Sequence, residues 1–462
     1  MPIREIPGTE LRYHLIVYDE RGRERRESDG TLLSAEIEQE LKDATERGKA
    51  DSAARITDVF FMSHGWKGDI PAAIEQYDRW MTEMATSRDL ATAKARPGGF
   101  RSLTVGLHWP SLPWGDEEIP ARGSPGMLAA DDDDNLVELF AQRIADTPRA
   151  RAALRQIVAA AGEASSADAL PRRAREAYDT LFEESGLTAA DVAGPPGSDQ
   201  DGWDPDRIYQ EAQRETEAAQ PAPIGEERST QPGVLGWTDK LRDAVLMPAR
   251  QLSFWKMKDR ARAFGESGGH ALLTSLMKAA PDARFHLMGH SFGCIVVSAT
   301  VAGGRGTALP RAVSSLFLVQ GALSIWSFCQ DIPHDRGKPG YFRRILDSEL
   351  VAGPIVTTRS RYDSAVGTFY PRGAQLKQQY VLADELPKYG GIGTFGAQGL
   401  GTIAEDLRMG NETYDYQFAP KRVYNLEASH VIKEGGPPSG AHSDIAHPEV
   451  AHAMWSAALA TP

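Results

Sequence analysis

The sequence has few cysteines, no long apolar run and no excess of positive charge. Only Cys294 and Cys329 occur among its 462 residues, too few for a disulfide framework and without the spacing of a metal-binding motif. The first residues lack the apolar core of a signal peptide, and no uninterrupted apolar stretch is long enough to span a bilayer. These absences predict a cytoplasmic protein, with signal-independent secretion left open.

The charge balance argues against a nucleic-acid partner. The formal net charge is −13 at pH 7, which opposes association with a polyphosphate. The basic run at residues 21–26 is short and contains an acid, which is typical of a solvated surface. We therefore expect no binding to DNA or RNA.

The composition is that of a globular chain with a sizeable core. Hydrophobic residues make up 41% and charged residues 25% of the sequence, a mixture unlike that of disordered chains. The length exceeds that of one ordinary core, and we interpret the chain as one large domain that carries an insertion.

Short apolar segments alternate with amphipathic segments in both halves of the chain. We expect strands at residues 11–18, 56–62, 103–109, 284–288, 316–320, 355–358 and 422–427, and helices at residues 34–47, 71–84, 268–280, 292–302 and 448–459. Ser34 is expected to cap the first of these helices, and Pro448 is expected to be the first helical residue of the last. The alternation predicts an α/β fold, with a mainly parallel, doubly wound sheet covered by helices on both faces.

This alternation stops in the middle of the chain. Residues 112–259 contain an acidic run, Ala/Arg/Glu-rich helical stretches and two linkers rich in Pro, Gly and Gln. We interpret them as an inserted helical lid between two parts of the core, residues 1–111 and 260–462. The aromatic-rich segment 234–264 is expected to pack mainly on the protein itself, with transient contact between the lid and a membrane surface as the alternative.

The strongest chemical signal is an apolar strand, a G-x-S-x-G turn and an apolar helix in direct succession at residues 284–302. A side chain can stand above a sheet only where the turn from strand to helix is very tight, and Gly289 and Gly293 leave the room for such a turn. Ser291 is therefore the candidate nucleophile. The following helix points its N-terminus at Ser291, so the amide of Phe292 can donate to an oxyanion.

A second oxyanion donor is expected after an early strand. The pair His64-Gly65 directly follows the strand expected at residues 56–62, which makes the amide of Trp66 the candidate donor. In the alternative interpretation, Gly65 only ends the strand and His64 packs locally.

A serine nucleophile needs a base, and histidine suits this role because its pKa lies near working pH. His442 is best placed, since it lies in a Gly-rich loop between the last expected strand and the last expected helix. The competing histidines are His430, expected at a strand end, and His447 and His452, expected with the last helix.

The acid should follow a strand between the nucleophile and the base. Asp363 meets this condition, because it lies in a loop beyond the strand expected at residues 355–358. The other candidates are less suitably placed, three of them before that strand and one in a polar loop: Asp331, Asp335, Asp347 and Asp384.

With these motifs, the chain resembles the α/β-hydrolase superfamily, and within it bacterial serine esterases and lipase-like members with an early His-Gly oxyanion segment. The similarity covers residues 11–110 and 260–460 and leaves the insertion unmatched. The resemblance implies a Ser-His-Asp triad and two amide donors, carried over to Ser291, His442, Asp363, Trp66 and Phe292. It also implies a small-molecule or lipid ester as substrate, an acyl-enzyme intermediate, and no metal or organic cofactor.

Other motifs exclude some related enzyme classes and leave two alternative functions open. The chain lacks the Gly-Gly-Gly run of hormone-sensitive-lipase-like enzymes, and a serine rather than an aspartate at residue 291 argues against dehalogenase or epoxide hydrolase chemistry. An acyltransferase with the same triad and a non-catalytic binding or scaffold protein are the alternatives. Cys294 is expected in the core, and three tryptophans are candidates to line the pocket: Trp109, Trp114 and Trp326. The pattern does not indicate an oligomeric state.

Overall fold

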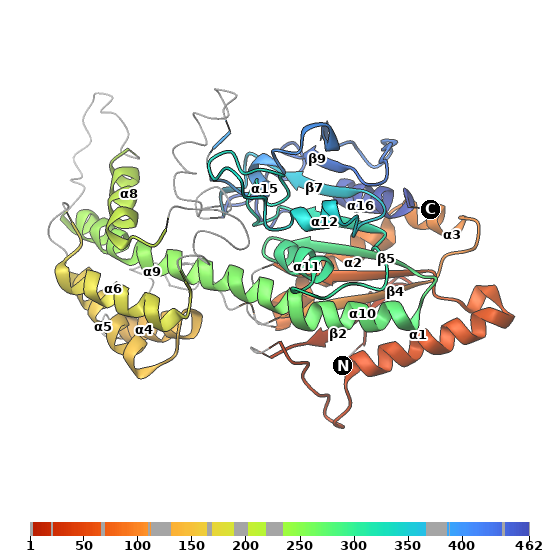
Figure 1. Cartoon of the computed structure of the whole chain (residues 1–462), viewed down its shortest axis with the longest axis horizontal. Coiled ribbons are helices and arrows are strands. Elements are labelled where there is room, and N and C mark those ends of the chain that lie inside the picture. Colours follow the sequence, from red (N-terminus) through yellow and green to blue (C-terminus); the bar gives the residue numbers. More distant parts are fainter. Residues whose placement is uncertain are drawn as a thin grey trace.

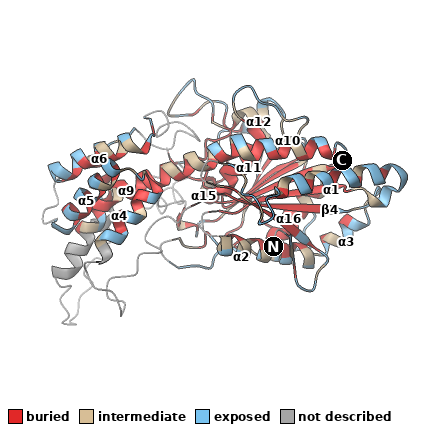
Figure 2. Ribbon diagram, turned by 90° about the horizontal axis from the view of Figure 1, so that it is seen from below, coloured by how far each residue is buried: buried red, intermediate tan, exposed pale blue. Residues whose placement is uncertain are grey.

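The computed structural model describes residues 3–19, 22–65, 70–109, 111, 131–163, 169–188, 202–218, 234–365, 386–387, 389–436 and 439–461. These residues form an α/β fold in which a central sheet lies between two layers of helices, with a group of further helices at one end (Figures 1 and 2). Among the described helices, none combines the length and apolar composition needed to cross a membrane.

The sheet is nine-stranded in the order β1-β2-β4-β3-β5-β6-β7-β9-β8. Its strands are β1 (Ile3–Glu5), β2 (Arg12–Val17), β3 (Asp58–Ser63), β4 (Ser102–His108), β5 (Arg284–His290), β6 (Ser315–Val319), β7 (Ile355–Arg359), β8 (Ala404–Arg408) and β9 (Val423–Glu427). All neighbouring strands are parallel except β1 and β2. Each expected strand is present with ends within two residues of the prediction, which confirms the mainly parallel sheet.

Helices cover both faces of the sheet because its strands are apolar on both sides. Along β3, Phe61 points to one layer and Phe60 to the other, as alternation along a strand requires. One layer contains α1 (Leu33–Ala50), α10 (His270–Ala279), α11 (Gly293–Ala302) and α12 (Arg343–Asp347), and the other contains α2 (Ile70–Thr86), α3 (Asp89–Lys94) and α16 (Pro448–Leu459). All residues of α11 are buried, as expected for a helix that is apolar on every side.

The start of α16 agrees with the prediction, whereas the start of α1 does not. Pro448 lies in the first turn of α16, as predicted. The prediction that Ser34 caps α1 is wrong, because α1 begins at Leu33 and Ser34 lies inside its first turn. The carboxylate of Glu24 instead accepts a hydrogen bond from the amide of Ser34 at 2.9 Å, so an acceptor from another segment satisfies this end of the helix.

The inserted helices pack along one long helix (Figure 1). They are α4 (Asp131–Arg143), α5 (Pro148–Glu163), α6 (Arg172–Ser185) and α8 (Pro205–Ala218), and the long helix is α9 (Val234–Phe264). At about 1.5 Å per residue, the 31 residues of α9 extend about 46 Å. The helix contains Pro248 and continues through a π-helical turn, Gly265–Gly269, into α10 of the core.

Polar and apolar contacts hold the insertion against α9. Lys256 donates to the carbonyl of Ser185 at the end of α6 at 2.6 Å, and Arg260 donates to the carbonyl of Gln142 near the end of α4 at 3.2 Å. Cations at these positions satisfy carbonyls that have no partner within their own helix. Six large apolar side chains of α9 are buried, as expected: Leu241, Val245, Leu252, Phe254, Trp255 and Met257. At Leu235 and Trp237 the structure describes the backbone only.

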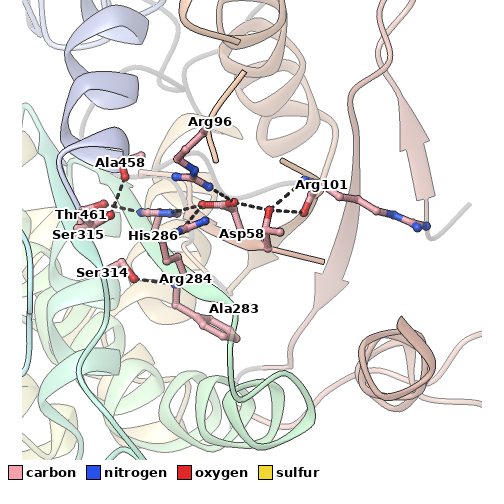
Figure 3. Close-up of polar contacts among 12 residues, drawn as sticks. Asp58, Arg96, Arg101, Ala283, Arg284, His286, Ser314, Ser315, Ala458 and Thr461 are labelled. Atoms are coloured by element: carbon pink, nitrogen blue, oxygen red, sulfur yellow. Dashed lines mark hydrogen bonds and ion pairs between the residues drawn. The ribbon is translucent and has the colours of Figure 1, made fainter. Parts of the chain in front are cut away.

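A buried ionic cluster joins three strands at the amino end of the sheet (Figure 3). The carboxylate of Asp58, at the start of β3, accepts hydrogen bonds from Arg96 at 2.6 Å, from Arg284 at 3.1 Å and from Nε2 of His286 at 3.1 Å. On β6, the hydroxyl of Ser315 lies 2.9 Å from Nδ1 of His286. Because the residues come from separate strands, the cluster fixes the relative positions of β3, β5 and β6.

The cluster makes stability depend on pH. Burial raises the pKa of Asp58, but hydrogen bonds from His286 and Thr57 and the charge of Arg284 outweigh it and hold the pKa below its ordinary value. Burial lowers the pKa of His286. In both groups the unfolded chain takes up a proton at a higher pH than the folded chain does, so acid favours unfolding.

We therefore expect the free energy of unfolding to fall as the pH drops below about 6.5, where the unfolded histidine protonates, and further below about 4, where the unfolded aspartate does. Asp58→Asn should lower the free energy of unfolding at pH 7 by about 3 kcal/mol, because it leaves the partly buried Arg96 and Arg284 without their carboxylate. Urea titrations at several pH values measure both effects. The control is Glu349→Gln, which removes an exposed ion pair with Lys421 and should change stability by less than about 1 kcal/mol. Equal effects of the two substitutions would contradict the role of the cluster.

Candidate active site

Ser291 lies in a sharp turn between β5 and α11. Its φ of 55° is in the left-handed region, which an L-residue adopts only at a steric cost. A Cβ on Gly289 would lie 2.4 Å from the carbonyl oxygen of Gly293, and a Cβ on Gly293 would lie 2.3 Å from the carbonyl oxygen of Ser63. Side chains do not fit at either position, which gives the physical reason for both glycines.

The structure brings Ser291, His442 and Asp363 together in one chain of hydrogen bonds. Nε2 of His442 lies 2.7 Å from Oγ of Ser291, and Nδ1 of His442 lies 2.8 Å from Oδ2 of Asp363. A carboxylate only accepts, so Nδ1 carries the proton and Nε2 accepts from the serine hydroxyl. The three side chains are buried and come from segments that follow β5, β7 and β9, at the carboxyl edge of the sheet.

Backbone pairing holds Asp363 next to His442. Asp363 and Gly440 form an antiparallel β-bridge, and the amide of Ala441 donates to the carbonyl of Tyr362 at 2.9 Å. Gly440 has a φ of 58°, and a Cβ there would lie 2.3 Å from the same carbonyl of Tyr362. The two segments therefore approach closely only because residue 440 has no side chain.

His290, the residue before Ser291, anchors His442 from another side. Nε2 of His290 lies 2.9 Å from the carbonyl oxygen of His442 and donates to it. The two imidazole rings lie 4.9 Å apart between centroids. The backbone of His442 is thus tied to the same turn that carries Ser291.

One residue that contacts Asp363 was not expected from the sequence. Gln320 directly follows β6, and its Nε2 donates to Oδ2 of Asp363 at 2.9 Å. Oε1 of Gln320 in turn accepts from the hydroxyl of Thr358 at 3.0 Å. A single glutamine at a strand end is a weak signal, so only its position in the expected strand at residues 316–320 could have drawn attention to it.

The candidate oxyanion site is described in part. Phe292 precedes α11, and amides in the first turn of a helix have no acceptor within that helix. Gly65 packs against the serine turn, because a Cβ there would lie 2.7 Å from Nδ1 of His290 and 2.8 Å from Cβ of Ser291. Trp66, the expected second donor, lies outside the described residues.

His64, next to Gly65, is a neutral core residue. Burial, together with the neighbouring His108, lowers the pKa of His64 to about 3. Nδ1 of His64 donates to the carbonyl of Gly65 at 2.6 Å, and the indole nitrogen of Trp109 donates to the carbonyl of His64 at 3.2 Å. These contacts hold the segment before the expected oxyanion donor in place.

The competing candidates lie elsewhere and have other contacts. His430 is exposed, His447 lies 2.7 Å from Asp444, and His452 lies 2.7 Å from Asp89. The competing acids form ion pairs with other residues, in the pairs Asp331 with Arg336, Asp335 with Lys338, and Asp347 with Arg343. Asp384 lies outside the described residues.

The cysteine and the tryptophans near the site are mostly core residues. Cys294 is fully buried, as expected, and burial raises the pKa of its thiol well above the ordinary value, which makes it unreactive. Trp109 and Trp326 are also buried, whereas Trp114 lies outside the described residues. Within the described part of the chain, no three His, Cys, Asp or Glu side chains are grouped to hold a metal ion.

No protein-family model, curated protein or solved structure matches this chain. The chemistry of the site therefore has to be inferred from its geometry.

Two substitutions of Ser291 separate the cost of its backbone conformation from the loss of its hydroxyl. Both Ser291→Ala and Ser291→Gly remove Oγ, but only glycine adopts a φ near 55° without steric cost. We expect the glycine variant to be more stable than the alanine variant by about 1 kcal/mol in urea denaturation. At Ser298, inside α11, the order should reverse, with glycine less stable by about 1 kcal/mol. The same order at both positions would show that the turn is not strained.

Proposed function

We propose that this protein is a serine hydrolase of the α/β-hydrolase fold that cleaves carboxylic esters. The observation that carries the proposal is the continuous hydrogen-bonded chain from Ser291 through His442 to Asp363. Its members lie far apart in the sequence and meet at the carboxyl edge of a parallel sheet, where α/β folds place ligands and reacting groups. The geometry matches that required for a nucleophile, a base and an orienting acid.

The first step of the proposed reaction is attack by Oγ of Ser291 on the ester carbonyl. His442 accepts the serine proton at Nε2 as the bond to carbon forms, and the negative charge moves to the carbonyl oxygen. The amide of Phe292 donates to this oxygen, and the N-terminus of α11 favours its charge. Asp363 stabilises the imidazolium and keeps the ring oriented.

The second half of the reaction releases the two products. His442 returns its proton to the leaving alcohol as the carbon–oxygen bond breaks, which leaves an acyl group on Ser291. A water molecule then attacks the acyl-enzyme while His442 takes a proton from it. His442 returns this proton to Oγ of Ser291 as the bond between Oγ and the acyl carbon breaks and the carboxylic acid departs.

The order of the elements supports the superfamily assignment within this proposal. The nucleophile follows β5 at a strand–turn–helix junction, the acid follows β7, and the base lies between β9 and α16. The chain order Ser, Asp, His is that of the α/β-hydrolase pattern. Fold alone does not establish activity, so the assignment depends on the reactivity of Ser291.

An apolar contact between the insertion and the serine turn favours a hydrophobic acyl group. The ring centroids of Phe254 in α9 and Phe292 lie 5.3 Å apart. An aromatic side chain of the insertion therefore packs against the residue that follows the nucleophile. We propose small-molecule or lipid esters as the substrate class. We do not propose contact with a membrane surface, because Phe254, Trp255 and the other large apolar side chains of α9 named above are buried.

Covalent labelling tests the nucleophile directly. A fluorophosphonate probe should label the wild-type protein at Ser291, because the probe's phosphoryl group reacts with an activated serine. Ser291→Ala should abolish labelling and lower kcat/KM for an aryl ester by about 10⁴-fold or more. Labelling is read by mass spectrometry of the modified peptide, and hydrolysis by release of the aryl alcohol.

Ser298→Ala is the matched control, since Ser298 is a buried serine of the adjacent helix outside the hydrogen-bonded chain. It should leave labelling unchanged. Transfer of the acyl group to an added alcohol, with little free acid formed, would favour the acyltransferase alternative. A folded wild-type protein that neither labels nor turns over esters would overturn the proposal and favour a non-catalytic binding protein.

A further inference from the structure

Gln320 occupies a backbone conformation that is unusual for its residue type. It directly follows β6 with a φ of 45°, in the region where L-residues pay a steric cost, and its side chain is completely buried. Strained backbone of this kind persists only where the surrounding structure holds it, and it is concentrated at functional sites. The contacts of the Gln320 side chain give the physical reason for this conformation.

Both ends of the Gln320 amide group are hydrogen-bonded. Nε2 donates to Oδ2 of Asp363 at 2.9 Å and to the carbonyl of Gly393 at 3.1 Å, while Oε1 accepts from the hydroxyl of Thr358 at 3.0 Å. The same hydroxyl of Thr358 lies 3.0 Å from the backbone amide of Gln320 and accepts from it. The side chain is thus held at three points and has one orientation available.

The local packing leaves no freedom for another arrangement. A Cβ on Gly393 would lie 2.8 Å from the carbonyl carbon of Gln320 and 2.9 Å from Oδ2 of Asp363. Gly393 therefore lets the glutamine and the carboxylate approach each other. The amide of Gly393 donates to the carbonyl of Gly321 at 3.0 Å, which fixes this segment to the residue after Gln320.

The oxygen that Gln320 contacts is the same one that contacts the base. Oδ2 of Asp363 accepts from Nε2 of Gln320 and from Nδ1 of His442. A carboxylate can turn about its Cβ–Cγ bond, and two donors that converge on one oxygen restrict this rotation. A neutral amide adds such a donor without adding a charge that competes with the imidazolium.

We propose that Gln320 is a positioning residue that holds the carboxylate of Asp363 in the orientation that directs Oδ2 at His442. The inference rests on the hydrolase function proposed above. Gln320 does not touch the substrate in this role, and it acts only through Asp363. A purely structural role would instead require Gln320 to contribute stability without affecting the acid–base contact.

Gln320→Met tests the proposal, because methionine has a similar unbranched shape but no donor. We expect kcat for an aryl ester to fall about 10- to 100-fold with KM changed less than about twofold, since a misplaced acid affects the transition state more than substrate binding. Proton NMR should show the downfield resonance of the Nδ1 proton of His442 shifted or broadened. Gln320→Leu is the second variant if the methionine variant does not fold.

Asn425→Leu is the matched control. Asn425 is a buried amide residue on β9 that exchanges two hydrogen bonds with the backbone of Ala397, and neither bond involves Asp363. This variant should lose stability while kcat and the Nδ1 proton resonance stay at wild-type values. If Asn425→Leu does not fold, Gln398→Met takes its place, since Gln398 donates to the carbonyl of Phe395 instead.

The outcomes separate the inference from the proposed function. A folded Gln320 variant with wild-type kcat and an unchanged Nδ1 proton resonance overturns the positioning role. An equal loss of kcat in the Asn425 control also overturns it, because the effect would then be one of general stability. If the wild-type protein shows no esterase activity, the proposed function fails, and the resonance alone decides whether Gln320 holds Asp363.

Discussion

The close approach of backbone segments around Ser291 is the constraint on which the site depends. The carbonyl oxygens of Ser63 and Gly293 occupy the space that side chains at residues 293 and 289 would need. This contact forces the chain from β5 into α11 within a single residue of positive φ. The same turn orients α11, exposes the serine hydroxyl to His442, and places His290 where it anchors the carbonyl of the base.

A serine, a histidine and an aspartate are hydrogen-bonded to one another at both the amino edge and the carboxyl edge of the sheet, but in different surroundings. At the amino edge, Asp58, His286 and Ser315 form a Ser-His-Asp chain, but it is enclosed and tied to arginines, so it stabilises strand packing. At the carboxyl edge, the serine stands on a strained turn beside a helix N-terminus. The same three side chains therefore do not define a reactive site without the backbone that presents them.

Much of the fold and of the site could be predicted because the relevant signals are local. Buried parallel strands read as short apolar runs, and the glycines flanking Ser291 follow from the sharpness of one turn. The edge strands β1 and β8 were missed, since β1 is three residues long and β8 is largely exposed. The role of Gln320 was missed because it depends on Asp363, 43 residues further along the chain. The Glu24 contact was missed because no local helix-capping pattern indicates an acceptor that lies ten residues before Ser34.

The continuity of α9 has a mechanical consequence. On its C-terminal side the insertion joins the core through a continuous helix and a π-helical turn. This connection contains no flexible loop about which the insertion could rotate. Any displacement of α4, α5, α6 and α8 relative to the core therefore requires α9 itself to bend. Pro248 has no backbone N–H, so one hydrogen bond of α9 is missing there. The helix is therefore expected to bend more easily at Pro248 than elsewhere.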